Sequence, residues 1–353
     1  MTIFTTTIFY CCILCICTIL ANVAQKKDNK KILIPIIVIL SMVAGFRHYS
    51  VGVDTEPYML SIENFYKIHK IVSPYNTFAI GYGYFTVFIY NIYHNYNFLL
   101  LIEAFIINTL IVLRFWDFRK SSSFTFMIFS YLLIIYLKTF NLNVQYIALA
   151  IVFYATKFVE DKKYIKFFIC IGISSLIHKS ALIGLIYFVI KWFDFKHMTK
   201  NELLTKVFTI VIGSILIIYA YNNLYASYSK YLSRESSIGF MCFAQLLIYV
   251  ITIFLYKHKL KENSEGKFKL VAIYYLIGII LSFSSYYISN AGRIAFYFMI
   301  FEPVFYGMIL KDKKNDKLFN FILICWIIFY SIYVIVDGNS NAGYLPYSFF
   351  WMK

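Results

Sequence analysis

A compact group of charged residues, "FRHYSVGVDTEPY" at 46–58, interrupts the long apolar runs near the start of the chain. Gly52 lies between Arg47 and Asp54 and allows the backbone to turn between them. An arginine suits a bidentate grip on a phosphate, and a nearby carboxylate suits the removal of a proton from a sugar hydroxyl. The alternative is that Arg47 reaches lipid headgroups and Asp54 simply pairs with it. The group therefore raises a hypothesis of phosphate and hydroxyl chemistry.

Two later segments add candidates of the same kind. His178 and Lys179 follow one apolar run, and Arg293 begins another. A histidine side chain titrates near neutral pH, so it could serve as an acid, a base or a donor to phosphate, and the lysine adds a positive charge. The alternative for His178 is a helix-end side chain bonded to a backbone carbonyl. Arg293 supports the same phosphate hypothesis as Arg47.

The composition determines which elements must position these residues. The chain has 353 residues, of which 61% are hydrophobic, 21% aromatic and only 14% charged, so an ordinary water-soluble domain is excluded. Apolar runs of about 15 to 22 residues recur along the chain, close to the length a helix needs to cross a bilayer, and they lack the alternation of a barrel. We therefore predict an all-α, polytopic integral membrane protein that forms a single domain over residues 1–353.

We expect about twelve transmembrane helices and one shorter segment. Residues 3–23 resemble a signal peptide, but no basic segment precedes them and no small-residue cleavage site follows, so we expect a retained span. The segment at 78–93 is short for a span, and we expect it to be re-entrant or interfacial. The predicted spans are 3–23, 32–46, 96–113, 124–138, 144–159, 164–178, 180–193, 207–222, 239–256, 269–286, 293–310 and 318–336.

The basic residues orient the chain. If 78–93 does not cross, most of the 33 lysine and arginine residues fall in loops on one face, which the positive-inside rule makes cytoplasmic. If it does cross, the lysine cluster "QKKDNKK" at 25–31 lies outside, against that rule. The net charge of +16 is thus explained by membrane anchors, and no nucleic-acid partner is expected. The candidate residues all fall on the outer face.

Other polar and sulfur-containing residues leave several roles open. Glu103 and Glu302 lie within predicted spans, where each would cost about 2.5 to 3.5 kcal/mol at the bilayer centre, so we expect partners or a wet cavity. Pro303 removes a backbone hydrogen bond and is expected to open the helix there. Tyr344 and Tyr347 suit either an interfacial belt or a sugar-binding surface. The seven cysteines fall in apolar runs, so neither a disulfide framework nor a metal site is implied, and no cofactor is expected.

The order of the motifs resembles a known family. After its second predicted span the chain carries an Arg, then Gly-x-Asp, then a Tyr. An Asn-rich turn with a Gln follows and leads into an Ala-rich span. A His-x-Ser-Ala sequence and an Arg at the start of a late span come after it. These are Arg47, Gly52, Asp54 and Tyr58, then Gln145 in "NLNVQYIALA", then His178 in "HKSALI", and Arg293. In this order and spacing the chain is similar to the EpsG-like, Wzy-type polymerases of bacterial capsule, exopolysaccharide and O-antigen.

The chain departs from the pattern of that family at two places. Val144 stands where the family usually has arginine before Gln145, so one phosphate contact is missing or is supplied by Lys138 or Lys179. The usual Gly-Thr-Asp-Tyr form is replaced by "GVDTEPY", which keeps Asp54 but changes its neighbours.

The resemblance implies glycosyl transfer at the outer face of the bacterial cytoplasmic membrane. Polyprenyl-pyrophosphate-linked oligosaccharide would be the substrate, without a metal, in the bilayer and alongside a chain-length regulator and a flippase of the same pathway. The roles it implies are as follows: Arg47 and Arg293 on pyrophosphate, Asp54 or His178 as catalytic base, Tyr58 in positioning, and Gln145 and Lys179 in substrate binding.

Three alternatives remain open at this level. A GT-C type polyprenyl-phosphate sugar transferase would use Asp54 and Glu56 to add one sugar. A flippase for lipid-linked oligosaccharide would line a central cavity with charges. A purely structural partner in a polysaccharide assembly complex would have a dispensable outer cluster.

Overall fold

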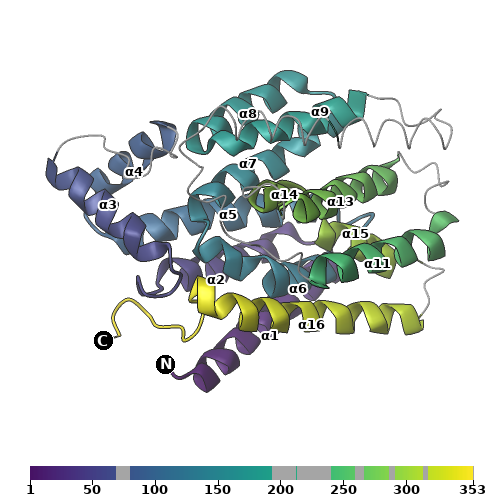
Figure 1. The fold of residues 1–353 in the computed structure, drawn as a ribbon, viewed down its shortest axis with the longest axis horizontal. Coiled ribbons are helices and arrows are strands. Elements are labelled where there is room, and N and C mark those ends of the chain that lie inside the picture. The colour runs from purple at the N-terminus through teal and green to yellow at the C-terminus, as the bar shows by residue number, and fades with distance from the viewer. Residues whose placement is uncertain are drawn as a thin grey trace. The chain divides into compact units, whose positions relative to one another are not determined.

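A computed structural model of the chain describes residues 1–68, 80–192, 212, 240–258, 266–285, 291–312 and 317–352 (Figure 1). Within these ranges the regular elements are helices, and an isolated antiparallel β-bridge joins Arg47 to Phe349. The elements are α1 (Ile3–Lys27), η1 (Lys30–Ile32), α2 (Leu33–Gly45), α3 (Thr55–Ile68), α4 (Ile80–Ile92), α5 (Tyr96–Asp117), α6 (Phe124–Ile134), η2 (Tyr136–Phe140), α7 (Asn143–Glu160), α8 (Tyr164–Ile177), η3 (Lys179–Gly184), α9 (Leu185–Trp192), α11 (Phe240–Leu255), α13 (Lys267–Ser284), α14 (Ala291–Met299), α15 (Glu302–Leu310) and α16 (Lys317–Ala342).

Some of the described helices have the length and surface of membrane spans. Four runs are long and apolar enough to cross a bilayer, namely α1, α5, α13 and the run Ala291–Leu310. Large apolar side chains on several helices face outward, such as Phe4, Ile165 and Phe254, which are 74%, 78% and 70% exposed. Lipid accepts such surfaces, whereas water does not. The all-helical prediction is confirmed for the described residues, and their long apolar helices are consistent with a membrane protein, while the number of twelve spans stays a prediction. The expected span at 207–222 falls outside the described residues, apart from position 212.

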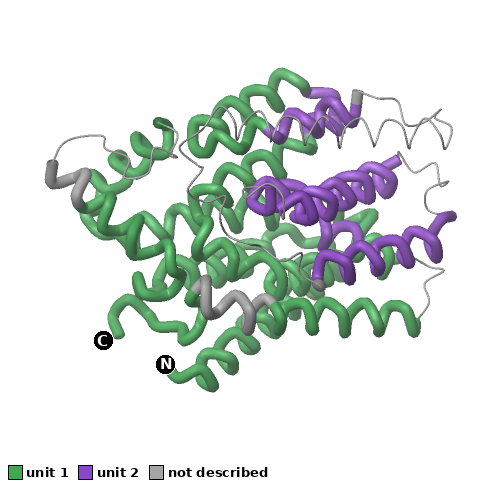
Figure 2. The backbone as a smooth tube through the Cα atoms, viewed as in Figure 1, with its two compact units in different colours: residues 1–157, 164–182, 306–353 green, residues 158–163, 183–305 purple. Residues whose placement is uncertain are grey.

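The chain divides into two compact units (Figure 2). The first comprises residues 1–157, 164–182 and 306–353, and the second comprises residues 158–163 and 183–305. The expectation of one polytopic domain remains a prediction, and each unit is described by itself.

In the first unit, α2 packs closely against α5, and both α1 and α16 pack against α6. Gly45 at the end of α2 permits this approach, since a Cβ there would lie 2.5 Å from the Cα of Leu101. Asn95 is the N-cap of α5, and its side chain accepts hydrogen bonds from the backbone amides of residues 97 and 98. The close packing brings the C-terminal end of α2 against the first turns of α5.

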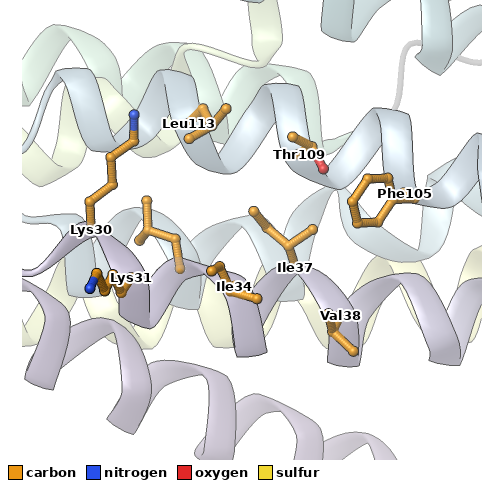
Figure 3. A pocket seen from close by; sticks show the side chains of 9 residues that line it. Lys30, Lys31, Ile34, Ile37, Val38, Phe105, Thr109 and Leu113 are labelled. Carbon is orange, nitrogen blue, oxygen red and sulfur yellow. The ribbon is translucent and has the colours of Figure 1, made fainter.

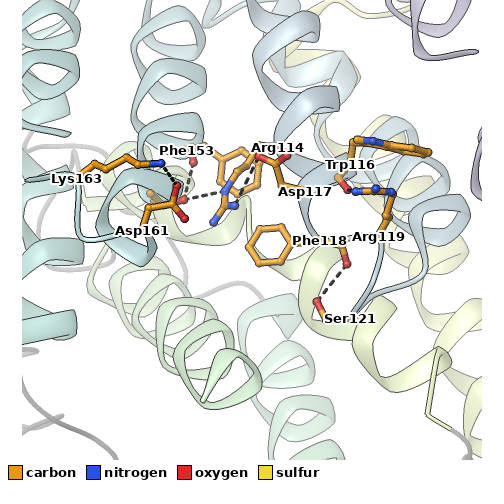
Figure 4. Close-up of polar contacts among 10 residues, drawn as sticks. Arg114, Trp116, Asp117, Phe118, Arg119, Ser121, Phe153, Asp161 and Lys163 are labelled. Carbon is orange, nitrogen blue, oxygen red and sulfur yellow. Dashed lines mark hydrogen bonds and ion pairs between the residues drawn. The ribbon is translucent and has the colours of Figure 1, made fainter. Parts of the chain in front are cut away.

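The opposite end of α5 carries a second group of polar contacts (Figure 4). Arg114 is buried, donates from Nε to Thr156 Oγ1 at 3.0 Å, and lies over the Phe118 ring at 4.1 Å. Arg119 pairs with Asp28 at 2.6 Å and so connects the α5–α6 loop to the end of α1. That this end of α5 faces the cytoplasm, as the lysine distribution predicts, stays a prediction.

The second unit is held by α13 and α14. Gly278 of α13 lies against Met299 of α14, where a Cβ would come within 2.9 Å of the Met299 backbone nitrogen. Tyr187 of α9 donates to the carbonyl of Tyr297, and its ring packs edge-on against Tyr274. Helix α14 ends at Met299 and α15 begins at Glu302, so the helix is interrupted beside Pro303, as the sequence predicts.

Several segments differ from the expected spans. The segment that follows α2 contains helix α3, which has no span-like apolar run but packs its partly buried face against an apolar cluster. The predicted span at 124–138 ends as an α-helix at Ile134 and continues as the 3₁₀ segment η2. Helix α4 has 13 residues, about 20 Å, which is shorter than the hydrocarbon core. Its re-entrant or interfacial placement stays a prediction.

Candidate functional site

Arg47, which sequence analysis placed at the outer surface, is buried in the first unit. Its side chain is 2% exposed, and its guanidinium donates to the carbonyl of Ala44 and to that of Phe140, the latter at 2.9 Å. The guanidinium carbon also lies 4.9 Å from the centre of the Phe140 ring. Its Nε is buried without a hydrogen-bond partner among the described residues. Arg47 therefore joins the end of α2 to the η2–α7 turn through its side chain.

The chain segment around Arg47 is covered by the C-terminal residues 343–350, which we call the tail strap. The bridge between Arg47 and Phe349 is flanked by bonds from His48 N to Ser348 O at 2.8 Å and from Phe350 N to Phe46 O at 2.9 Å. A further bond, from Gly52 N to Gly343 O at 2.9 Å, fixes the other end of the strap. The tail strap thus fixes both ends of residues 46–52.

Tyr347 attaches the tail strap to helices α1 and α2. Its hydroxyl donates to the carbonyl of Val43 in α2 at 2.8 Å, and its amide donates to Thr6 Oγ1 of α1 at 3.0 Å. The ring also stacks on Phe9 of α1, with centroids 5.0 Å apart. These contacts bury Tyr347 completely and explain why an aromatic residue with a hydroxyl occupies the position.

Asp54 meets the tail strap and the η2–α7 turn. Gly52 has a φ of +92°, a conformation that favours glycine, and the chain turns there so that Asp54 N donates to Asn141 Oδ1 at 3.4 Å. Burial raises the pKa of Tyr344 to about 12, opposed by a side-chain hydrogen bond with Asn141 and increased by the nearby charge of Asp54. Asp54 itself is half-buried. A carboxylate, an amide and a tyrosine hydroxyl therefore come together where three segments meet.

Glu103 of α5 is buried and lies near enough to Arg47 to influence its charge. Its two carboxylate oxygens accept hydrogen bonds from Tyr82 Oη at 2.8 Å and from Asn143 Nδ2 at 2.5 Å. Burial lowers the pKa of the Arg47 guanidinium, and the nearby Tyr96 and Glu103 oppose that shift. The arginine still carries its charge, because its ordinary pKa is far above neutral pH. Glu103 thus has the partners that an acidic side chain in a span requires.

The first turn of α5 forms hydrogen bonds with the backbone of residues 45–55, and these contacts were not predicted from the sequence. Asn97 Nδ2 donates to the carbonyls of Gly45 at 3.2 Å and Arg47 at 2.8 Å, and Tyr96 Oη donates to the carbonyl of Thr55 at 3.1 Å. The sequence signal was the polar run "NYN" at 95–97, directly at the start of an apolar helix.

Tyr58 and Gln145 lie on helices that begin at the same group. Tyr58 is half-buried in the first turns of α3 and packs against an apolar cluster that includes Ile62 and Tyr96. Gln145 is 3% exposed in the first turn of α7. Val144, at the position where the resemblance expects an arginine, is 1% exposed, so this helix turn contributes an apolar side chain there.

His178 and Lys179 lie in the first unit at the turn between α8 and η3. The His178 ring nitrogen Nδ1 is 2.6 Å from Ser180 Oγ, and the backbone amide of Ser180 also points to it at 3.4 Å. Both side chains are half-buried. Arg293 is exposed at the start of α14 and belongs to the second unit. The structure therefore joins Arg47 and Asp54 into one cluster, and it describes His178, Lys179 and Arg293 on other turns.

In this cluster the Asp54 carboxylate is reactive and partly accessible, whereas Arg47 is buried and supports the loop. Asp54 is held by its backbone in a fixed position and retains an exposed part, as a general base needs. The Arg47 guanidinium is directed at two backbone carbonyls, so contact with a phosphate would require it to give up those bonds. Direct phosphate binding by Arg47 stays a prediction, and its observed contacts order the loop that carries Asp54.

The helices and this end-of-helix polar cluster define a polytopic α-helical membrane protein. The chain belongs to the EpsG family, whose model matches residues 30–349 and so covers the cluster and most of the tail strap. That family is associated with polysaccharide biosynthesis and with glycosyltransferase-like polymerase activity. Comparison with curated proteins gave no match, and comparison with solved structures gave none either.

Proposed function

We propose that this chain is a polymerase that joins polyprenyl-pyrophosphate-linked oligosaccharide units into a surface polysaccharide. In the reaction, a hydroxyl of the acceptor unit attacks the anomeric carbon of the donor chain. The new glycosidic bond forms as the bond to the pyrophosphate oxygen breaks, and the hydroxyl proton passes to a base. Cations stabilise the departing pyrophosphate, which leaves on its lipid carrier.

The proposed topology places this reaction at the outer face of the bacterial cytoplasmic membrane. Most lysines and arginines lie in the loops at the other end of the helices, including residues 26–31 and 114–120. The cluster at Arg47 and Asp54 follows α2, one crossing away from the first of those loops. Twelve crossings, with α4 re-entrant or interfacial, are part of the same proposal.

The observation that carries the proposal is the position of Asp54. The turn at Gly52, the Asn141 side chain and the tail strap hold this half-buried carboxylate at a helix end, where three segments of the chain converge. Such a location has access both to the membrane surface and to lipid-borne substrates. We assign Asp54 as the base that accepts the hydroxyl proton, with His178 as the alternative.

The remaining roles follow from accessibility and charge. Arg293 is exposed and Lys179 is half-buried, so both can reach a pyrophosphate more directly than the buried Arg47. Tyr58 and Gln145 are assigned to positioning of the sugar. A chain-length regulator and a flippase are the partners that such a pathway requires.

The test uses cells whose own copy of the gene is deleted and measures the chain length of lipid-linked and surface polysaccharide. We expect wild type and Glu56→Gln to restore long chains, and Asp54→Asn to leave single repeat units on the outer face. Glu56 is a matched control, because it lies two residues further on and is exposed. Protein levels in the membrane must be equal between variants.

Each alternative predicts a different product. Units that stay on the cytoplasmic side indicate a flippase. A repeat unit that lacks one sugar, together with equal loss in Asp54→Asn and Glu56→Gln, indicates a GT-C type transferase. Full polymerisation by Asp54→Asn and loss in His178→Asn would move the catalytic base to His178.

A further inference from the structure

An apolar groove of about 390 Å³ runs between α2 and α5, at the end of the first unit opposite the Asp54 cluster (Figure 3). Ile34 and Val38 of α2 face Phe105 and Thr109 of α5 across it. Lys30 and Lys31 lie at one end, and Val38 and Phe105 form the other, apolar end.

Two lysines close the polar end of the groove. Lys30 and Lys31 belong to η1, are exposed, and line the groove beside Leu113 (Figure 3). Lys26 and Lys27 precede them at the end of α1, so four lysines lie within six positions. Clusters of this kind next to a membrane-spanning helix attract anionic lipid headgroups. The groove therefore combines an apolar wall with a cationic entrance.

The length of the groove matches one leaflet. From Lys30 to Val38 the helical rise is about 12 Å, close to half of the roughly 30 Å hydrocarbon core. An acyl chain that lies in the groove would thus begin at the lysines and end near the middle of the bilayer.

Thr109 distinguishes between kinds of lipid. Its hydroxyl is buried and has no hydrogen-bond partner among the described residues. It lies one helical turn deeper than Leu113, about 6 Å along α5. In a phospholipid, carboxylic ester carbonyls lie just below the phosphate and could accept this hydrogen bond, whereas a polyprenyl phosphate has no carbonyl group.

From these observations we infer that the groove between α2 and α5 binds an anionic diacyl phospholipid. The phosphate lies at Lys30 and Lys31, an ester carbonyl accepts from Thr109, and one acyl chain occupies the groove up to Val38. This site is separate from the Asp54 cluster and does not depend on the polymerase assignment. Under the proposed topology the lipid belongs to the cytoplasmic leaflet.

The experiment measures lipid binding to the purified full-length protein in detergent by native mass spectrometry. The probes are phosphatidylglycerol and phosphatidylcholine with identical acyl chains, undecaprenyl phosphate, and inorganic phosphate. We expect phosphatidylglycerol to bind at least tenfold more tightly than phosphatidylcholine, since two lysines near a surface favour an anionic lipid by roughly 30-fold. Inorganic phosphate should not compete, because it lacks the acyl chain.

Variants test the two halves of the groove. Lys30→Ala with Lys31→Ala should lose about 30-fold in affinity for phosphatidylglycerol. The control pair, Lys120→Ala with Lys166→Ala, removes the same charge from exposed positions on the same predicted face and should change affinity less than threefold.

A second pair of variants tests the apolar wall on α2. Val38→Trp should fill the groove and reduce binding at least tenfold, whereas Met42→Trp, at a similarly exposed position outside the groove, should not. An unchanged elution profile of each variant shows that it still folds.

Three outcomes would overturn the inference. Phosphatidylcholine could bind as tightly as phosphatidylglycerol, the lysine pair could behave like its control, or undecaprenyl phosphate could displace phosphatidylglycerol at lower concentration. The last result would make the groove a carrier-lipid site. A Thr109→Val variant that loses affinity for phosphatidylglycerol but not for undecaprenyl phosphate would support the ester contact.

Discussion

Replacement of Arg47 tests whether its buried guanidinium holds the fold of the site. In Arg47→Met the carbonyls of Ala44 and Phe140 lose their charged donor, and the Glu103 carboxylate loses the opposite charge nearby. A buried acceptor that loses its donor costs about 1–3 kcal/mol, so the two carbonyls together cost about 2–6 kcal/mol. We expect a loss of stability of that size, measured by equilibrium unfolding in mixed micelles with a denaturing detergent.

The second step of this test asks whether Arg47 and Glu103 are coupled. The double variant Arg47→Met with Glu103→Gln should differ from the sum of the two single variants by about 0.5–3 kcal/mol, because groups in one buried network couple by that amount. Arg293→Met is the control, since this arginine is exposed and a surface substitution changes stability by no more than about 0.5 kcal/mol.

A different result would refute the reasoning. If Arg47→Met lost less than about 1 kcal/mol while polymerisation disappeared, the guanidinium would act on the substrate and not on the fold. Arg47→Lys adds a second criterion. Lysine cannot present a planar fork to two carbonyls, so a positioning role predicts that it fails, whereas a simple phosphate contact predicts partial activity.

Three further predictions concern other contacts. Gly45→Ala should cost at least about 1–3 kcal/mol of folding stability because its Cβ meets the α5 backbone, whereas Gly172→Ala, which faces open space, should not destabilise. Arg119 lowers the pKa of the exposed Asp28 through a hydrogen bond. The pair therefore contributes its stability at pH values above the ordinary aspartate pKa, and this contribution is lost as the pH falls through the lowered pKa of Asp28. Asp28→Asn should abolish this part of the pH dependence of the thermal midpoint. Tyr347→Phe should cost about 1 kcal/mol and speed proteolysis of the tail strap, both measurable on purified protein.

The apolar helices could be predicted from sequence because a bilayer demands long runs without charge. Helices α1, α5, α7 and α11 begin and end within a few residues of the expected spans. The break before Pro303 also follows from local chemistry, since proline lacks an amide hydrogen.

Helix α3 and the break within the span at 124–138 depend on tertiary packing. Hydropathy does not register a short amphipathic helix whose one face packs on neighbours in the protein. A 3₁₀ segment such as η2 is equally hidden, because its residues remain apolar while the backbone changes.

The candidate site was predictable in part. Arg47, Asp54 and Gln145 were singled out by residue type and by the order of motifs, and the first two contact the same η2–α7 turn, at Phe140 and Asn141. The burial of Arg47 could not be foreseen, because the segment that covers it is the tail strap at the far end of the chain. Asn97 was missed for a similar reason. Its side-chain amide donates to two carbonyls at the C-terminal end of α2, and no local sequence pattern indicates a partner on another helix.

The tail strap has a consequence for the order of events during synthesis. Tyr347 and the α2 carbonyl that it binds are 304 residues apart in the chain. At 5–20 residues per second, roughly 15 to 60 s pass between translation of the two segments. During that interval α2 and residues 46–52 have already been made, but the tail strap that covers Arg47 has not. The site therefore becomes complete only when residues 343–350 have been made and reach the loop at 46–52.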